Sequence, residues 1–231
     1  MKRVLPPCAK THFEHIYSSI DCSYHQQQFR ARMKAAVIKS EVKILVDDIV
    51  DALPNLKRNK APGPDSITAE AFLYGTPRLM AHIGILFSWF LEYRYLPEEF
   101  TRSIFIPLVK NKSGDYTDAE NYRAIMISNA ITKLLEFVLY DKLVTASSED
   151  VYQFGFKAKH STGLCAGILK RTISYYTDRG SLVFCAFIDF SKAFDRVNYW
   201  HLFNKLLDDN VLFHVVRLLA FSYSHQNVAV C

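Results

Sequence analysis

A short apolar run that ends in an aspartate is the feature that most constrains the fold of this chain. Residues 183–188, VFCAFI, are rich in β-formers and predict a strand buried on both faces, with Asp189 at its end. Asp195 follows six residues later. Asn198 then offers a cap to an amphipathic helical segment, 199–207. A buried strand, an acid at its tip, a tight connection and a helix form a common arrangement for holding a divalent cation near a phosphate.

The run around this aspartate also carries a resemblance. Residues 186–202, AFIDFSKAFDRVNYWHL, resemble the first palm motif of reverse transcriptases of the non-LTR retrotransposon and group II intron type, in which a D-x-S-K-A-F-D core recurs. The resemblance implies that Asp189 is a catalytic metal ligand, that the backbone carbonyl of Phe190 can face the metal, and that Phe194 lies under the incoming sugar. Phosphoryl transfer fits this set, because it needs metal ions and hard cations need carboxylate oxygens. The alternative is that Asp189 and Asp195 are strand-end and cap acids and that Phe194 is a core residue.

The composition describes a packed protein and leaves its partner open. With 231 residues, 50% of them apolar and 14% aromatic, the chain can form one or two domains with a real core. A formal net charge of +5 suits a polyanionic partner but equally suits solvated helix faces. The five cysteines include no C-x-x-C pair, so reduced thiols inside a cell are expected.

We expect a soluble intracellular protein and leave open whether it is nuclear or cytoplasmic. The basic N-terminus lacks the apolar region of a secretory signal. The most apolar run, 79–91, is shorter than the roughly 20 residues that a membrane span needs.

The first 39 residues are expected to form an extension whose role the sequence does not define. Cys8, His12, His15 and Cys22 have the spacing C-x3-H-x2-H-x6-C, which matches no zinc-finger pattern. Free cysteines and histidines are more often packing or surface residues. A zinc-dependent binding module on these four residues is therefore a minor hypothesis.

A second motif lies in a loop between two predicted helices. Apolar residues at helical spacing predict a helix over 40–53, and a Thr-Pro start predicts another over 77–94. Between them, residues 59–65, NKAPGPD, contain two prolines and a glycine and must form a defined loop. This string resembles the signature that opens the reverse transcriptase domain of non-LTR elements, although by itself it is also an ordinary polar turn.

A third motif lies in a predicted β-hairpin. Strands are predicted at 102–109, RSIFIPLV, and at 121–127. The pattern I-P-L-x-K, an acidic turn and N-Y-R resembles the fingers strands of the same family, which implies that Lys110 and Arg123 grip the nucleotide triphosphate or pack over its base. Family members usually have proline after N-Y-R, whereas this chain has Ala124. The alternative is a basic residue at each end of an exposed hairpin.

A fourth motif precedes the palm run. Residues 153–162, QFGFKAKHST, resemble the family's Q-x-G-F-R-x-x-x-S-T segment, with lysine at the usual arginine position. In this segment Lys157, Lys159 and His160 could contact template phosphates. Helices are predicted on either side, over 128–144 and 162–176.

The later palm motifs of the family do not occur in these residues. The sequence holds neither a Q-G-S/T turn nor a Y/F-A-D-D hairpin, and its Asp-Asp pairs at 47–48 and 208–209 lack a strand-turn-strand setting. Two-metal catalysis needs cations about 3.5–4 Å apart, bridged by carboxylates from separate strands. Mg²⁺ or Mn²⁺ is therefore expected only together with the missing palm carboxylates, and the chain is expected to be inactive alone.

Taken together, the matches predict an α+β fold with right-hand polymerase fingers and an incomplete palm, helix-rich with a fingers β-hairpin. The expected domains are an N-terminal extension over 1–39, fingers over 40–180 and a truncated palm over 181–231. We interpret the chain as an N-terminal fragment of a reverse transcriptase domain, with an RNA template, a DNA primer and a deoxynucleoside triphosphate as partners and with no membrane association.

Three points remain alternatives or expectations. The chain could instead be a non-catalytic remnant that binds RNA or nucleotide without polymerase activity. Its oligomeric state is not predicted. An open sheet edge and an uncovered apolar face in the truncated palm predict poor solubility of the chain when it is expressed alone.

Overall fold

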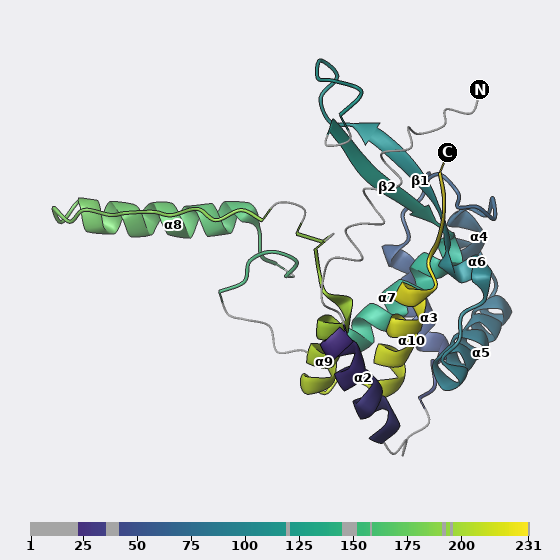
Figure 1. The fold of residues 1–231 in the computed structure, drawn as a ribbon. Coiled ribbons are helices and arrows are strands. Elements are labelled where there is room, and N and C mark those ends of the chain that lie inside the picture. Colours follow the sequence, from purple (N-terminus) through teal and green to yellow (C-terminus); the bar gives the residue numbers. More distant parts are fainter. Residues whose placement is uncertain are drawn as a thin grey trace. The chain divides into compact units, whose positions relative to one another are not determined.

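The computed structural model describes residues 23–35, 42–118, 121–144, 152–157, 159–190, 193–194 and 196–230. The chain forms two compact units, one made of Met1–Ser147 with Val197–Cys231 and the other of Ser148–Arg196. The architecture is helix-rich with a small sheet, as an α+β fold requires (Figure 1). The division into fingers and palm at residue 180 stays a prediction.

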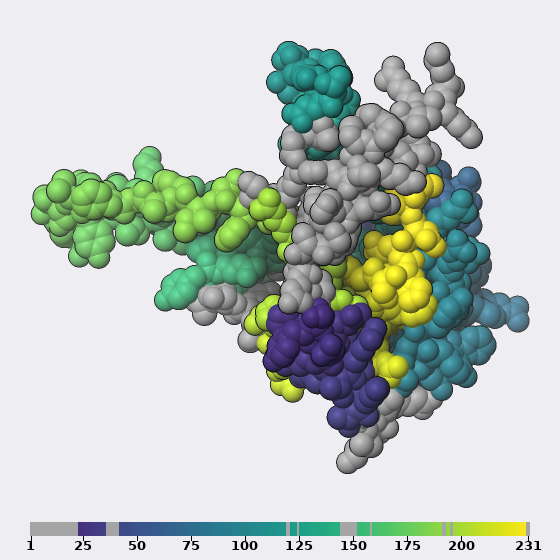
Figure 2. Space-filling view, in the orientation of Figure 1, coloured from purple at the N-terminus to yellow at the C-terminus, as the bar shows by residue number. Residues whose placement is uncertain are grey.

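Helices build most of the first unit, and their apolar faces form its core. Helix α3 packs against α5 and α7, while α10 packs against α5, α7 and α9. Figure 2 shows the yellow residues of α10 lying against the blue-green residues of α5. The first-unit helices are α2 (Ser23–Ala35), α3 (Val46–Ala52), the 3-10 helix η1 (Leu53–Asn55), α4 (Glu70–Leu73), α5 (Pro77–Tyr93), α6 (Glu98–Thr101), α7 (Ala130–Val144), α9 (Tyr199–Asp208) and α10 (Phe213–Ser224).

The sheet has the strand order β2-β1-β3. Strand β1 (Arg102–Val109) pairs antiparallel with β2 (Tyr122–Ser128), from Ser103 opposite Ser128 to Val109 opposite Tyr122. The third strand, β3 (Asn227–Val230), pairs parallel with β1 over Arg102 to Phe105 only. Pro107 of β1 lies beyond that pairing, so its missing N–H removes no bond to β3.

Side-chain caps set several helix starts where the sequence predicts them. The Thr76 hydroxyl accepts a hydrogen bond from the Leu79 amide, with Pro77 in the first turn of α5. Likewise, the Asn198 side chain accepts from the His201 amide at the start of α9, 3.1 Å away. These helices and the hairpin are confirmed.

The helix predicted over 40–53 begins only at Val46. The preceding segment is held outside a helix because the Ile44 amide donates to the Ser88 hydroxyl of α5 at 2.8 Å. The Leu45 amide in turn donates to the Asp48 carboxylate at 2.8 Å, which caps the shorter helix. Burial does not mark the helix start, since Ile49 in the helix and Ile44 before it are 0% and 5% exposed, whereas Leu45 between them is 61% exposed.

The second unit contains one described helix, α8 (Thr162–Thr177), which starts where the sequence predicts. The Ser161 hydroxyl accepts from the Leu164 amide at 3.1 Å. No residue of α8 is buried. No described helix is long and apolar enough to cross a membrane.

The prediction of a buried strand over 183–188 is wrong. Residues 181–190 have no regular secondary structure, and Phe184, Phe187 and Ile188 are 91%, 83% and 83% exposed. A strand needs a neighbour to satisfy its backbone groups. The three strands found among the described residues all belong to the first unit, and none of them pairs with residues 183–188.

Candidate nucleotide and nucleic-acid interface

The β1–β2 hairpin brings Lys110 and Arg123 onto one face. Arg123 is directly opposite Leu108 in the ladder. Just beyond the end of β1, the Lys110 amide donates to the Asn121 carbonyl at 2.7 Å and so extends the pairing. Because residues two apart on a strand share a face, Lys110 and Arg123 are diagonal neighbours, about 7–8 Å apart at their backbones. Both side chains are exposed and form a cationic pair near the hairpin turn.

Asn121, the first residue of the N-Y-R motif, fixes the turn that positions this pair. Its side-chain oxygen accepts from the Asn111 amide at 2.9 Å, and its side-chain nitrogen donates to the carbonyls of Asn111 at 3.0 Å and Asp115 at 3.1 Å. In the same turn, the Thr117 hydroxyl and amide hydrogen-bond Asp115 and lower the pKa of that carboxyl. The asparagine is therefore a structural part of the motif, while the arginine is available to a ligand.

The loop over 59–65 docks closely on the start of α7. Its Asp65 amide donates to the Asn129 side-chain oxygen at 3.2 Å, and the Asn129 side-chain nitrogen donates to the Glu99 carbonyl at 2.9 Å. A Cβ atom on Gly63 would lie only 2.6 Å from the Cα of Asn129. The glycine of P-G-P is thus required by a close backbone approach. Sequence reasoning missed Asn129, although a polar residue between a strand and a helix is a possible signal.

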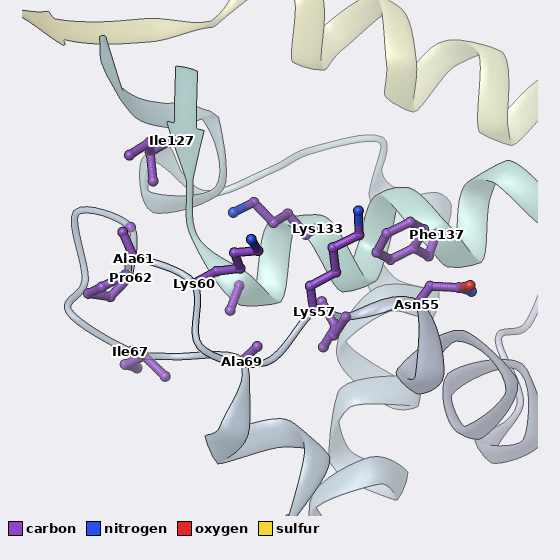
Figure 3. Close-up of a pocket in the computed structure, with 13 residues that line it drawn as sticks. Asn55, Lys57, Lys60, Ala61, Pro62, Ile67, Ala69, Ile127, Lys133 and Phe137 are labelled. Atoms are coloured by element: carbon purple, nitrogen blue, oxygen red, sulfur yellow. The ribbon is translucent and has the colours of Figure 1, made fainter. Parts of the chain in front are cut away.

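A pocket of about 390 Å³ lies between this loop and α7, as Figure 3 shows. Lys57, Lys60 and Lys133 line it, together with mainly apolar side chains. The sequence showed a cluster of basic residues at 57–60 but gave no sign that Lys133, more than 70 positions later, belongs to the same place. This pocket is a cationic feature separate from the pair on the hairpin.

The three template-contact candidates lie close together in the second unit. The His160 amide donates to the Lys157 carbonyl at 3.2 Å, and the His160 ring meets Phe154 edge-on with ring centroids 5.5 Å apart. Lys159, between them, has a positive φ of 61° and an exposed side chain. This turn gathers Lys157, Lys159 and His160 within one short segment, and their contact with template stays a prediction.

Asp189, Phe190 and Phe194 also belong to the second unit, and all three are exposed. The alternative that Phe194 is a core residue is wrong, because its side chain is 72% exposed. Its ring meets the Phe156 ring edge-on, with ring centroids 6.0 Å apart. Asp195 lies outside the described residues. Asp189 does not lie at the end of a strand, because residues 181–190 form no strand.

The described residues do not fit a magnesium or manganese site. Among them, no three His, Cys, Asp or Glu side chains gather closely enough to hold a metal ion. Asp189 alone supplies one exposed carboxylate, whereas a two-metal site needs several. Cys8, His12, His15 and Cys22, the minor zinc hypothesis, lie outside the described residues.

Comparison with known proteins finds sequence similarity to polymerases of mobile elements. The chain is 28% identical over 163 residues to a probable RNA-directed DNA polymerase from transposon BS of Drosophila melanogaster, over 68% of this chain. It is 24% identical over 167 residues to the RNA-directed DNA polymerase from mobile element jockey of the same fly, again over 68% of this chain. It is also 24% identical over 178 residues, 76% of this chain, to a retrovirus-related Pol polyprotein from type-1 retrotransposable element R1 of Bradysia coprophila.

The chain is thus similar in sequence to the RNA-directed DNA polymerases of non-LTR retrotransposons. It spans only 18%, 17% and 18% of the lengths of these three relatives. No family model matches the sequence. The resemblance seen in the four motifs is confirmed, and the roles of individual site residues stay predictions.

The residues predicted to contact the nucleotide fall into two sets, one in each unit. Lys110 and Arg123 belong to the first unit, and Asp189, Phe190 and Phe194 to the second. Of the predicted nucleotide contacts, the structure therefore brings together the two cations on the hairpin. The lysine pocket beside α7 was not predicted from the sequence.

Proposed function

We propose that this chain is part of the reverse transcriptase domain of a non-LTR retrotransposon and that its hairpin binds the triphosphate of the incoming deoxynucleotide. The relationship to retrotransposon polymerases supports the first part. The observation that carries the second is the placement of Lys110 and Arg123 as exposed diagonal neighbours on one hairpin face. An arginine fork and a lysine point charge are complementary to adjacent phosphate oxygens.

Polymerisation itself would join the primer 3′ oxygen to the α-phosphorus of the nucleotide, with pyrophosphate as the leaving group. We propose that Asp189 supplies one carboxylate for this reaction and that further carboxylates come from sequence outside these 231 residues. Phe190 and Phe194 are proposed nucleotide contacts. An aromatic side chain at 194 beneath the sugar would clash with a 2′-hydroxyl and so favour deoxynucleotides.

Nucleotide binding by the hairpin can be tested with the 231-residue chain and a fluorescent dATP analogue. Lys110→Ala and Arg123→Ala should each weaken binding about tenfold, the loss of one hydrogen bond to a charged group. Arg30→Ala and Lys205→Ala remove exposed cations from α2 and α9 and should leave affinity unchanged. Equal affinities for hairpin variants and controls would show that the hairpin does not bind the nucleotide.

Catalysis is tested by primer extension on an RNA template in the presence of Mg²⁺. The 231-residue chain is compared with a longer version that includes the downstream reading frame, and each is paired with Asp189→Asn. Asp178→Asn, at the end of α8, is the matched control because it is an exposed acid in the same unit. Only the longer chain should extend the primer, and only Asp189→Asn should abolish extension. Extension by the short chain would overturn the proposed need for further carboxylates.

A further inference from the structure

We propose that the pocket between the 57–69 segment and α7 binds the phosphate of one nucleotide unit within a single nucleic-acid strand. The inference rests on the proposed function, since it names a second contact for the strand that a polymerase would copy. Its basis is a cationic, partly apolar pocket that neither the sequence motifs nor the relatives assign to any ligand.

Three lysines from two elements reach this pocket. Lys57 and Lys60 come from the segment after η1, and Lys133 comes from the first turn of α7. In Figure 3 the amino groups of Lys60 and Lys133 point toward the same space between loop and helix. Ala130, Lys133 and Phe137 all line the pocket because positions three and four apart share a helix face.

The charge of the pocket is not matched by an acid in its lining, which contains three lysines and no Asp or Glu. Two nearby carboxylates accept hydrogen bonds from backbone amides. Glu70 accepts the Asn59 amide at 2.6 Å, and Asp65 accepts the Ile67 amide at 3.0 Å. Glu136 of α7 interacts electrostatically with Lys133 and offsets part of its charge. An anion is therefore the complementary ligand, favoured further by the amino end of the 15-residue helix α7.

The remaining lining suits the sugar or base next to that phosphate. Leu56 and Ala69 are 5% and 8% exposed and form buried wall, while Ile67, Ile127 and Phe137 add apolar surface. The volume of about 390 Å³ falls at the lower end of the range for small-molecule pockets, roughly 300–1,000 Å³. A nucleotide unit, with one charged and one apolar part, matches this division.

Strand β2 connects the pocket with the hairpin cations. This connection favours a nucleic-acid strand, rather than a free nucleotide, as the ligand of the pocket. Arg123, Ile125 and Ile127 share one face of β2, because alternate residues point the same way. Arg123 and Ile127 are four residues apart, about 13 Å at a strand rise of ~3.3 Å. Ile127 lines the pocket, so a strand lying along this face could contact both cationic features.

The test measures binding of a fluorescent 12-nucleotide single-stranded RNA to the 231-residue chain across salt concentrations. Lys60→Gln and Lys133→Gln should each weaken binding several-fold and lower the salt dependence by about 0.7 in the log–log slope, as expected for one lost phosphate contact. Lys34→Gln and Lys205→Gln, exposed lysines on α2 and α9, should change neither quantity.

A further variant tests whether RNA must enter the pocket, independently of the charge of the lysines. Ala61 lines the pocket and is exposed, so Ala61→Phe should fill the space without changing net charge or the fold, and it should weaken RNA binding. Thermal melts of every variant check that the first unit is intact. Pocket variants that bind RNA as tightly as the controls would overturn the inference and leave the proposed function standing.

A titration with free nucleotide shows whether the phosphate that binds the pocket belongs to a nucleic-acid strand or to a free nucleotide. The same variants are titrated with the fluorescent dATP analogue, and the pocket variants should bind it as the native chain does. Loss of dATP binding together with RNA binding would identify the pocket as a free-nucleotide site and overturn the strand assignment. Failure of the native chain to bind RNA at all would instead count against the proposed function and the inference together.

Discussion

Gly63 lies so close to Asn129 that a Cβ atom on the glycine would clash with the Asn129 side-chain oxygen. This contact joins the NKAPGPD loop to the start of α7 and shapes one wall of the lysine pocket. Backbone atoms of Asn129 lie within 2.6–2.7 Å of the same point, so rotation of one side chain cannot relieve the clash.

Gly63→Ala should therefore lower the free energy of unfolding by about 1–3 kcal/mol, the usual cost of overpacking. Urea unfolding followed by circular dichroism measures the change. Gly167→Ala is the matched control, because a Cβ there meets nothing within 4 Å and alanine is favoured inside α8. Equal stability of Gly63→Ala and the native chain would mean that the loop does not dock on Asn129.

Asn129→Ala should also destabilise the first unit, for a different reason. Asn129 is 3% exposed, and its side chain satisfies the Asp65 amide and the Glu99 carbonyl. Leaving such groups unsatisfied costs about 1–3 kcal/mol. The adjacent Ser128→Ala, measured by the same urea unfolding, should cost less because Ser128 is only half-buried. A smaller loss for Asn129→Ala than for Ser128→Ala would contradict this account.

Glu70 should make the stability of the loop region depend on pH. The Asn59 amide, and then its own backbone amide and the Thr68 hydroxyl, hydrogen-bond this carboxylate and hold the pKa of Glu70 below its usual range. A carboxyl with a lowered folded-state pKa stabilises the fold above its unfolded-state pKa, and the contribution is lost as the pH falls through the folded-state pKa. Glu70→Gln should thus be less stable than the native chain at pH 7, and the difference should shrink toward pH 3.

Urea unfolding at a series of pH values measures this difference. Glu92→Gln, an exposed acid on α5, is the control and should show no such trend. If the difference in unfolding free energy between Glu70→Gln and the native chain stayed constant from pH 7 to pH 3, the ionised carboxylate would not be its cause.

Arg32 should matter more to stability than the acid it pairs with. Its guanidinium is 2.8 Å from the Asp208 carboxylate and also donates to the Asn204 carbonyl at 3.0 Å, which joins α2 to α9. Because Asp208 is 67% exposed, Asp208→Ala should cost about 0–1 kcal/mol. Arg32→Ala loses both contacts and should cost more in thermal or urea unfolding. Equal costs for the two variants would show that the ion pair, not the carbonyl contact, holds the two helices together.

The apolar run over 183–188 should govern aggregation. Phe184 and Phe187 are 91% and 83% exposed, and clustered exposed apolar side chains promote association. The double variant Phe184→Ser/Phe187→Ser should raise the soluble fraction on expression and leave the unfolding of the first unit unchanged. Tyr152→Ser, which removes another highly exposed aromatic of the same unit, serves as the control. No gain over this control would place the aggregation surface elsewhere.

Local signals predicted much of the fold. The caps at Thr76, Ser161 and Asn198 act within a few residues of the helices that they start, so the sequence reveals them directly. The hairpin is equally local, with a turn closed by Asn121. For the same reason, the sequence alone predicts that Lys110 and Arg123 lie on one hairpin.

The errors concern features that depend on distant partners. A β-forming run becomes a strand only beside another strand, and residues 183–188 find none among the described residues. In the same way, Gly63 and Lys60 meet Asn129 and Lys133 only because tertiary packing brings the loop onto α7. No pattern of residue spacing encodes such a meeting, which is why the pocket emerged only from the structure.

The unequal lengths of pairing on the two sides of β1 have a mechanical consequence. Strand β3 supports β1 only from Arg102 to Phe105, whereas β2 accompanies it to Val109. Beyond Phe105 the sheet narrows to a two-stranded ribbon, and such ribbons twist more strongly than wider sheets. The hairpin is thus three-stranded near Ile127 and two-stranded toward Lys110. A small rotation of the three-stranded part would therefore displace Lys110, at the far end of the hairpin, by a larger distance.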